Sequence, residues 1–79
     1  MAQFKYIRTK TGFTLWPDMT SVYHSHMAKL TSQQIISAGF CRYTGTVFVC
    51  YGEAKSLGIG SIPEDSAELT KFFDQTMYD

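Results

Sequence analysis

The sequence predicts one small α+β domain over residues 1–79, with the element order β-β-α-β-β-α. Two observations predict it: two pairs of strand-like segments that each meet at a glycine-containing turn, and two segments whose apolar residues recur at helical spacing. For this order, the simplest expected arrangement is one antiparallel sheet built from two β-hairpins, with both helices packed on one face. The 44% apolar content and the zero net charge are typical of a folded chain and exclude intrinsic disorder.

The first hairpin is expected over residues 3–17. Residues 3–9 alternate between two faces and are rich in aromatic and β-branched side chains, so they form a strand. Lys10-Thr11-Gly12 supplies the turn, because glycine adopts positive φ without steric strain. The alternation resumes at Phe13 and stops at Pro17, which has no N–H to donate to a ladder.

A first helix is expected over residues 22–30. Side-chain oxygens that could cap its first turn precede it, on Asp18, Thr20 and Ser21. One face carries apolar residues at helical spacing, namely Tyr23, Met27 and Leu30. The residues expected to point mainly outward are His24, Ser25, Ala28 and Lys29.

The second hairpin is expected over residues 34–51, with its turn at Thr44-Gly45. Gly39 in its first arm predicts a bulge or a close approach of another backbone. Registers about this turn place Cys41 and Cys50 either as diagonal neighbours or on opposite faces, so we expect two buried, reduced thiols and no disulfide. Residues 52–60 contain three glycines and predict irregular structure or a short edge strand.

The last helix has the clearest signature in the chain. Ser61-Ile62-Pro63-Glu64 fits a capping box with proline in the first turn. The apolar stripe that follows consists of Leu69, Phe72, Phe73 and Met77. The acids that complement the positive end of the helix dipole are Glu64, Asp65 and Glu68.

The distribution of charge limits the functions to consider. Residues 1–42 hold five Lys and Arg against one acid, a net charge of +4, and residues 43–79 hold two against six, a net charge of −4. Overall neutrality makes nucleic acid an unlikely main partner. No apolar run is long enough to span a membrane, the start lacks the apolar block of a secretory signal, and two cysteines are too few for a disulfide scaffold. We therefore expect a cytoplasmic protein without membrane association.

No pattern of catalytic or metal-binding residues is present. His24 and His26 are two residues apart, and on a helix such side chains diverge by about 200°, so they do not share one metal ion. Ser21 and Ser25 lie near them without a nucleophile-elbow pattern. The segment Gly52 to Gly60 has neither the spacing of a phosphate-binding loop nor that of a dinucleotide fingerprint. We expect no enzyme, no metal and no cofactor.

The remaining candidates are binding residues. Lys5, Tyr6 and Arg8 interleave bases with aromatics, as in sheets that stack single-stranded bases, although a lysine-guarded edge strand has the same composition. Trp16 is either part of the core or an interface anchor. The full set of candidates is Lys5, Tyr6, Arg8, Trp16, His24, Glu64 and Glu68. Twelve aromatic residues exceed what one helix layer covers, which predicts a homodimer that buries the open face of the sheet.

Several blocks of the chain resemble small uncharacterised proteins of enterobacterial bacteriophages and prophages. These blocks are Gly12 to Pro17, His24 to Ala28, Ser37 to Phe40, Cys50 to Glu53, and Ser56 to Asp65. The resemblance implies a phage accessory protein that binds a host factor or a defence complex, and it assigns no functional residue.

The leading hypothesis is a non-enzymatic, homodimeric accessory protein that binds a host protein through an exposed sheet face or the acidic C-terminal helix. The alternative is a small binder of single-stranded nucleic acid or nucleotides that uses Phe4, Lys5, Tyr6, Arg8 and Arg42. A third hypothesis, an enzyme built around His24 or His26, requires a nucleophile or carboxylate within hydrogen-bond reach of a ring nitrogen.

Overall fold

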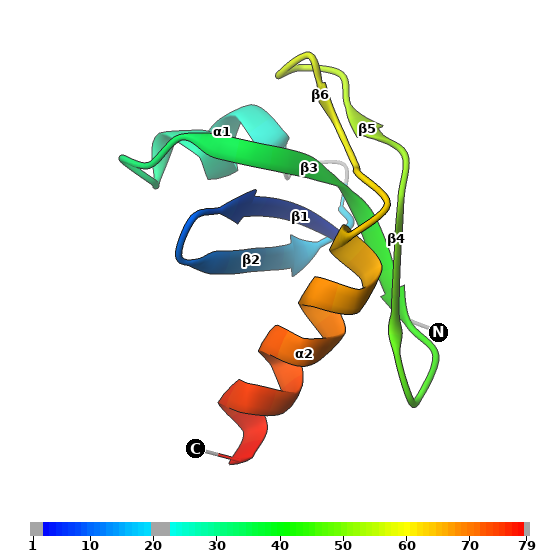
Figure 1. Ribbon diagram of the computed structural model, residues 1–79. Helices are drawn as coiled ribbons and strands as arrows, with labels where there is room; N and C mark the ends of the chain where they lie inside the picture. Colours follow the sequence, from blue (N-terminus) through cyan, green and yellow to red (C-terminus); the bar gives the residue numbers. More distant parts are fainter. Residues whose placement is uncertain (1–2, 20–22, 79) are drawn as a thin grey trace.

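The computed structural model describes residues 3–19 and 23–78. Its elements, in chain order, are β1 (Gln3–Thr9), β2 (Gly12–Pro17), α1 (His24–Lys29), β3 (Ile35–Tyr43), β4 (Phe48–Tyr51), β5 (Glu53–Ala54), β6 (Ile59–Gly60) and α2 (Asp65–Tyr78). The predicted α+β class, the two hairpins and the order of the two helices are confirmed (Figure 1). In the segment where irregular structure or an edge strand was expected, β5 and β6 form a small hairpin of their own.

The four long strands form one antiparallel sheet in the order β2-β1-β3-β4. The two predicted hairpins are therefore joined through β1 and β3, where Tyr6 lies opposite Gly39 and Ile7 lies opposite Ala38. This arrangement puts β1 and β3 in the centre of the sheet and leaves β2 and β4 at its edges.

Both faces of the sheet are covered, because neighbouring residues of the central strands are buried on opposite sides. On one face Tyr6 packs in a cluster with Cys41, Phe48 and Leu69. On the other face Ile7 packs with a second cluster, composed of Met27, Ala38 and Ala54. The domain thus has two thin cores that share one sheet.

The helices lie on opposite faces, which differs from the expectation that both would cover the same one. Leu69 of α2 belongs to the Tyr6 cluster, and Met27 of α1 belongs to the Ile7 cluster together with Ala54 of β5. In Figure 1, α2 crosses one side of the sheet, while α1 and the β5–β6 hairpin lie on the other. The exposed second face, from which a face-to-face homodimer was inferred, is therefore absent among the described residues.

Helix α1 is shorter than predicted and lacks the expected cap. Its N-cap residue, Tyr23, makes no side-chain capping hydrogen bond. Of the three candidate caps, Asp18 instead forms an ion pair with Lys5, whereas Thr20 and Ser21 lie outside the described residues. Only Met27 of the predicted apolar stripe is buried, since Tyr23 is 53% exposed and Leu30 is 71% exposed.

Helix α2 begins with a capping arrangement shifted by one residue from the predicted box. The Asp65 carboxylate accepts the backbone N–H of Ile62 at 3.2 Å, and the Asp65 N–H donates to the Ile62 carbonyl at 3.0 Å. Pro63 then occupies the first position of the first turn, where its missing N–H leaves no bond unmade. Ser61, the predicted cap, donates its hydroxyl to the Gly52 carbonyl instead.

Gly39 confirms the expected close approach of another backbone. A Cβ atom at this position would lie 2.6 Å from the carbonyl oxygen of Tyr51 on the neighbouring strand. The irregularity in the ladder occurs elsewhere, where the β1–β3 register shifts between Arg8 and Thr9.

Candidate functional site

Two of the predicted site residues, Tyr6 and Arg8, meet at a buried carboxylate. Asp65 is 0% exposed, and its Oδ1 accepts hydrogen bonds from Arg8 Nη1 at 3.1 Å and from Ser37 Oγ at 2.9 Å. Its Oδ2 accepts the hydroxyl of Tyr6 and the N–H of Ile62. Four donors from β1, β3 and the turn before α2 therefore satisfy one buried negative charge, as the interior of a protein requires.

Tyr6 does not have the base-stacking role that was predicted for it. Tyr6 is fully buried, so its ring cannot stack on a base without disruption of the core. Burial raises the pKa of its hydroxyl far above the usual range, and the hydrogen bond to Asp65 raises it further. Tyr6 is consequently a neutral donor at all physiological pH values, and its position is structural.

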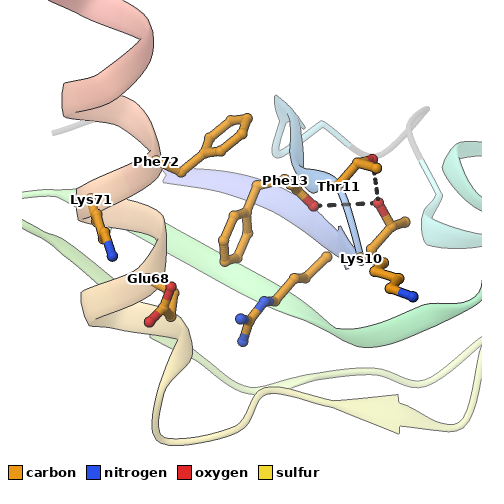
Figure 2. Close-up of a pocket in the computed structure, with 9 residues that line it drawn as sticks. Lys10, Thr11, Phe13, Glu68, Lys71 and Phe72 are labelled. Atoms are coloured by element: carbon orange, nitrogen blue, oxygen red, sulfur yellow. Dashed lines mark hydrogen bonds between the residues drawn. The ribbon is translucent and has the colours of Figure 1, made fainter.

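Arg8 and Glu68 reach a small polar pocket between the β1–β2 turn and α2 (Figure 2). The pocket has a volume of about 240 Å³ and is lined by Arg8, Thr9, Lys10, Thr11, Gly12, Phe13, Glu68, Lys71 and Phe72. Figure 2 shows the rings of Phe13 and Phe72 side by side between the turn and the helix. Glycine is favoured at position 12, because its φ is +147° and a Cβ there would lie 2.4 Å from the Phe72 ring.

The charges of this pocket are partly neutralised within it. The Arg8 guanidinium is bonded to Asp65 and lies 5.3 Å from the centre of the Phe13 ring. Lys10 and Lys71 supply two exposed ammonium groups, and Glu68 supplies one exposed carboxylate. The pocket has room and charge for a small anion.

Lys5 and His24 meet on the opposite face of the sheet. They line a pocket of about 410 Å³ with Tyr23, Phe40, Glu53, Lys55 and Ser56. His24 was expected to point outward, but it is 5% exposed, and its Nε2 lies 2.7 Å from the Gly39 carbonyl. A carbonyl only accepts, so Nε2 carries a proton and donates it, while the ring edge packs against Phe40.

His26 is the exposed histidine of the helix, so the two imidazoles do not converge. No group of three potential metal ligands occurs in the described part of the chain. Hydrogen bonding to the Gly39 carbonyl positions the His24 ring in the core and occupies its Nε2 nitrogen.

The remaining two predicted site residues lie apart from these pockets. Trp16 is half-buried and packs against the Ile7–Met27 cluster, which favours its role in the core over that of an interface anchor. Glu64 is exposed in the turn that leads into α2. Lys5 also donates to the Met19 carbonyl at 2.9 Å and pairs with Asp18 at 3.5 Å.

A feature missed in the sequence is the way α2 covers the edge of the sheet at β4. The outward N–H of Phe48 donates to Thr70 Oγ1 at 2.8 Å, and that of Cys50 donates to Ser66 Oγ at 2.9 Å. The spacings match, because four helical residues rise about 6 Å and two strand residues span about 6.7 Å. The only sign of this contact in the sequence is a pair of hydroxyl residues, Ser66 and Thr70, four positions apart on α2. That spacing predicts no contact unless the strand beside the helix is already known.

Next to these hydrogen bonds lies a largely apolar groove of about 610 Å³. It is lined by Val47, Phe48, Val49, Ser66, Ala67, Thr70, Lys71 and Asp74. Val47 is 45% exposed, and Ala67 is exposed too. This groove lies between β4 and α2, whose exposed residues Glu68 and Asp74 are acidic.

The two cysteines face each other directly, which corrects both registers considered from the sequence. The β3–β4 turn is centred one residue later than expected, so Cys41 lies opposite Cys50. Because the Cys50 N–H points away from β3 to Ser66, this is a pair without mutual main-chain bonds, with Cα atoms about 4.5 Å apart. That spacing lies within the range of a disulfide, and both cysteines are free thiols in the structure.

The thiols have contrasting electrostatic environments. The hydrogen bond that the Cys41 thiol donates to Cys50, together with burial, raises the pKa of Cys41 far above its usual range. The hydrogen bond with Cys41 lowers the pKa of Cys50, although burial opposes this shift. Cys50, which is only half-buried, is therefore the thiol that ionises first.

Comparison of the chain with protein-family models, with curated proteins and with solved structures gives no match. Within the described residues, no helix is both long enough and apolar enough to cross a lipid bilayer.

Proposed function

We propose that this chain is a non-enzymatic binding protein that captures a segment of another protein in the groove between β4 and α2. The observation that carries the proposal is the position of an apolar surface beside a helix whose exposed charges are mainly acidic. This surface is formed by the exposed residues Val47 and Ala67 and by the half-buried Val49. Surface that is apolar in the centre and charged at the rim is typical of protein interfaces.

The charge of α2 indicates the chemistry of the bound segment. The exposed charged residues of the helix and the turn before it are Glu64, Glu68, Lys71 and Asp74, which leaves a net charge of −2. Asp65 adds nothing outside, since Arg8 neutralises it in the interior. A segment with apolar side chains and Lys or Arg beside them complements this surface.

The covered edge of β4 restricts how such a segment binds. Thr70 and Ser66 already accept the outward N–H groups of Phe48 and Cys50. A partner therefore cannot use these donors to add a strand, and it must bind through its side chains in the groove. If the resemblance to phage proteins holds, the proposed partner is a protein of the host cytoplasm.

The test uses a pair of matched substitutions. Val47 and Ile36 are both large apolar residues with nearly equal exposure, 45% and 47%, and Ile36 lies outside the groove. We expect an array of random synthetic peptides to yield ligands rich in Lys, Arg and apolar residues, whose binding Val47→Lys weakens at least tenfold while Ile36→Lys leaves it unchanged. Acidic ligands, or equal effects of the two variants, would contradict the proposal.

The alternative, a binder of nucleotides or single-stranded nucleic acid, is favoured by the cationic side chains in the pocket of Figure 2, above all Lys10 and Lys71. Its stacking platform is weakened by the burial of Tyr6. If it holds, single-stranded DNA or RNA oligonucleotides bind at low salt with an affinity that falls as salt rises. The double substitution Lys10→Gln and Lys71→Gln should then reduce the slope of log affinity against log salt concentration by about 1.4. No binding at low ionic strength would exclude it.

A further inference from the structure

The two edges of the sheet differ in whether their backbone is covered. At β4, hydroxyls of α2 accept the outward N–H groups. At β2, the ladder with β1 runs on to Asp18, whose N–H donates to the Gln3 carbonyl at 3.2 Å. Since antiparallel pairs alternate, Gly12, Thr14 and Trp16 point their backbone groups toward β1.

The backbone groups of Phe13 and Leu15 therefore point outward from β2. No strand among residues 3–19 and 23–78 pairs with that side. The strand itself carries no charged residue, and its one proline, Pro17, is its last residue. The charges or prolines that usually protect an open edge are therefore missing between Gly12 and Trp16. The outer edge of β2 is thus ready to pair with a further strand.

We propose that this edge pairs with β2 of a second copy of the chain, antiparallel about a two-fold axis that passes between the two Thr14 residues. In this register Phe13 lies opposite the second copy's Leu15, and Leu15 lies opposite the second copy's Phe13. Each pair exchanges two main-chain hydrogen bonds, so four bonds join the copies into one continuous eight-stranded sheet.

The neighbouring registers use fewer of the outward groups. A shift that places Leu15 opposite Leu15 puts Phe13 opposite Pro17, which has no N–H and whose carbonyl already accepts the N–H of Met19 at 2.9 Å. A shift in the other direction places Leu15 opposite Thr11, within the turn. Only the Thr14-centred register engages both donors and both acceptors of each strand.

Charge complementarity identifies the second copy as the occupant. In the Thr14-centred register, Lys10 at one end of the hairpin lies opposite the second copy's Asp18, and the two-fold axis repeats this pair. Asp18 already pairs with Lys5 of its own chain at 3.5 Å, so Lys10 is a second cation beside that carboxylate. Lys10 and Asp18 are both exposed. The half-buried side chains of Phe13 and Leu15 also meet on the α2 face and extend the Tyr6 cluster across the axis. This dimer does not depend on the proposed groove, which lies at the opposite edge of the sheet.

The test introduces a charge of either sign at the two-fold axis. Thr14 is exposed, so Thr14→Lys and Thr14→Glu should fold, and each places two like charges directly opposite. We expect sedimentation velocity to show a concentration-dependent dimer for the unmodified chain, dimerisation weakened roughly tenfold in each variant, and its recovery in an equimolar mixture of the two. The matched controls are Thr46→Lys and Thr46→Glu in the exposed β3–β4 turn, which should leave dimerisation unchanged.

A second measurement does not require any variant. Amide hydrogen exchange of the unmodified chain should slow at Phe13 and Leu15 as concentration rises, while Thr14, bonded to β1 in each copy, stays equally protected. A chain that remains monomeric at millimolar concentration, a dimer without protection at these two amides, or a mixture that fails to associate would each overturn the proposal.

Discussion

Asp65 is the residue on which the interior depends most. It is fully buried, and its four donors come from two strands of the sheet and from the turn before its own helix. This carboxylate connects the start of α2 to the two central strands, because Tyr6 and Arg8 lie on β1 and Ser37 lies on β3. From the sequence, Asp65 was expected only to complement the positive end of the helix dipole. The structure adds its hydrogen bonds to the two central strands.

Asp65→Asn tests the network. The amide keeps the shape of the side chain, but its NH₂ group meets donors, and the Arg8 guanidinium and the Ile62 N–H cannot become acceptors. We expect a loss of about 3 kcal/mol in the free energy of unfolding, measured by urea denaturation. Asp74→Asn, an exposed acid of the same helix, should change it by less than about 0.5 kcal/mol.

The cysteine pair yields a second prediction at this scale. The pKa of Cys50 is lowered and its side chain is half-buried, whereas the pKa of Cys41 is raised and its side chain is fully buried. Thiolates are the reactive form, so iodoacetamide at pH 8 should modify Cys50 first. Peptide mass spectrometry of singly modified protein measures this, with urea-unfolded protein as the control in which both react equally. Earlier modification of Cys41 would contradict it.

Among the elements, α2 has two separate roles. Its inner side, with Leu69, closes one core, while Ser66 and Thr70 on its flank accept the N–H groups of the edge strand β4. Thr70 also donates its hydroxyl to the Ser66 carbonyl at 2.8 Å. The Phe48 N–H, the Thr70 hydroxyl and the Ser66 carbonyl therefore form one chain of hydrogen bonds. Edge protection in this fold is therefore asymmetric, with β4 covered and β2 open.

Removal of these hydroxyls should expose the β4 edge. Ser66→Ala and Thr70→Val each leave an N–H of β4 without its acceptor, and each is expected to lower the free energy of unfolding by about 1 to 3 kcal/mol. The double variant should also aggregate at concentrations where the unmodified chain does not, which light scattering records. Ser56→Ala, in the exposed β5–β6 turn, should change neither quantity.

For the whole molecule, the decisive property is that one sheet supports two cores. Adjacent residues of β1, Tyr6 and Ile7, belong to different clusters, so the same strand contributes to both cores. Many of the aromatic residues that were expected to exceed one helix layer pack in or against these two cores, whereas Tyr23 is 53% exposed. Among the described residues, the surface features available for partners include the outer edge of β2, the groove between β4 and α2, and further pockets on both faces of the sheet.

The two cores should therefore unfold together. Leu69→Ala removes a buried side chain on the α2 face, and we expect it to destabilise the domain by about 3 kcal/mol. Trp16, the single tryptophan, packs in the other cluster. The unfolding midpoint that its fluorescence reports should nevertheless fall by the full amount that this loss of stability predicts. Leu30→Ala, at a residue that is 71% exposed, is the control. If Leu69→Ala left the unfolding midpoint measured by Trp16 fluorescence unchanged, the two cores would unfold independently.

Local patterns in the sequence determined the elements: alternation predicted the strands, helical spacing and the proline near Glu64 predicted α2, and their order predicted an α+β sheet. These features depend on neighbours within a few residues, and the chain itself carries them. Which face each helix covers, the one-residue shift that sets Cys41 opposite Cys50, and the burial of His24 were decided only by tertiary structure. They depend on contacts between distant segments, such as Asp65 with Tyr6 and Ser66 with β4, whose energies no local pattern contains.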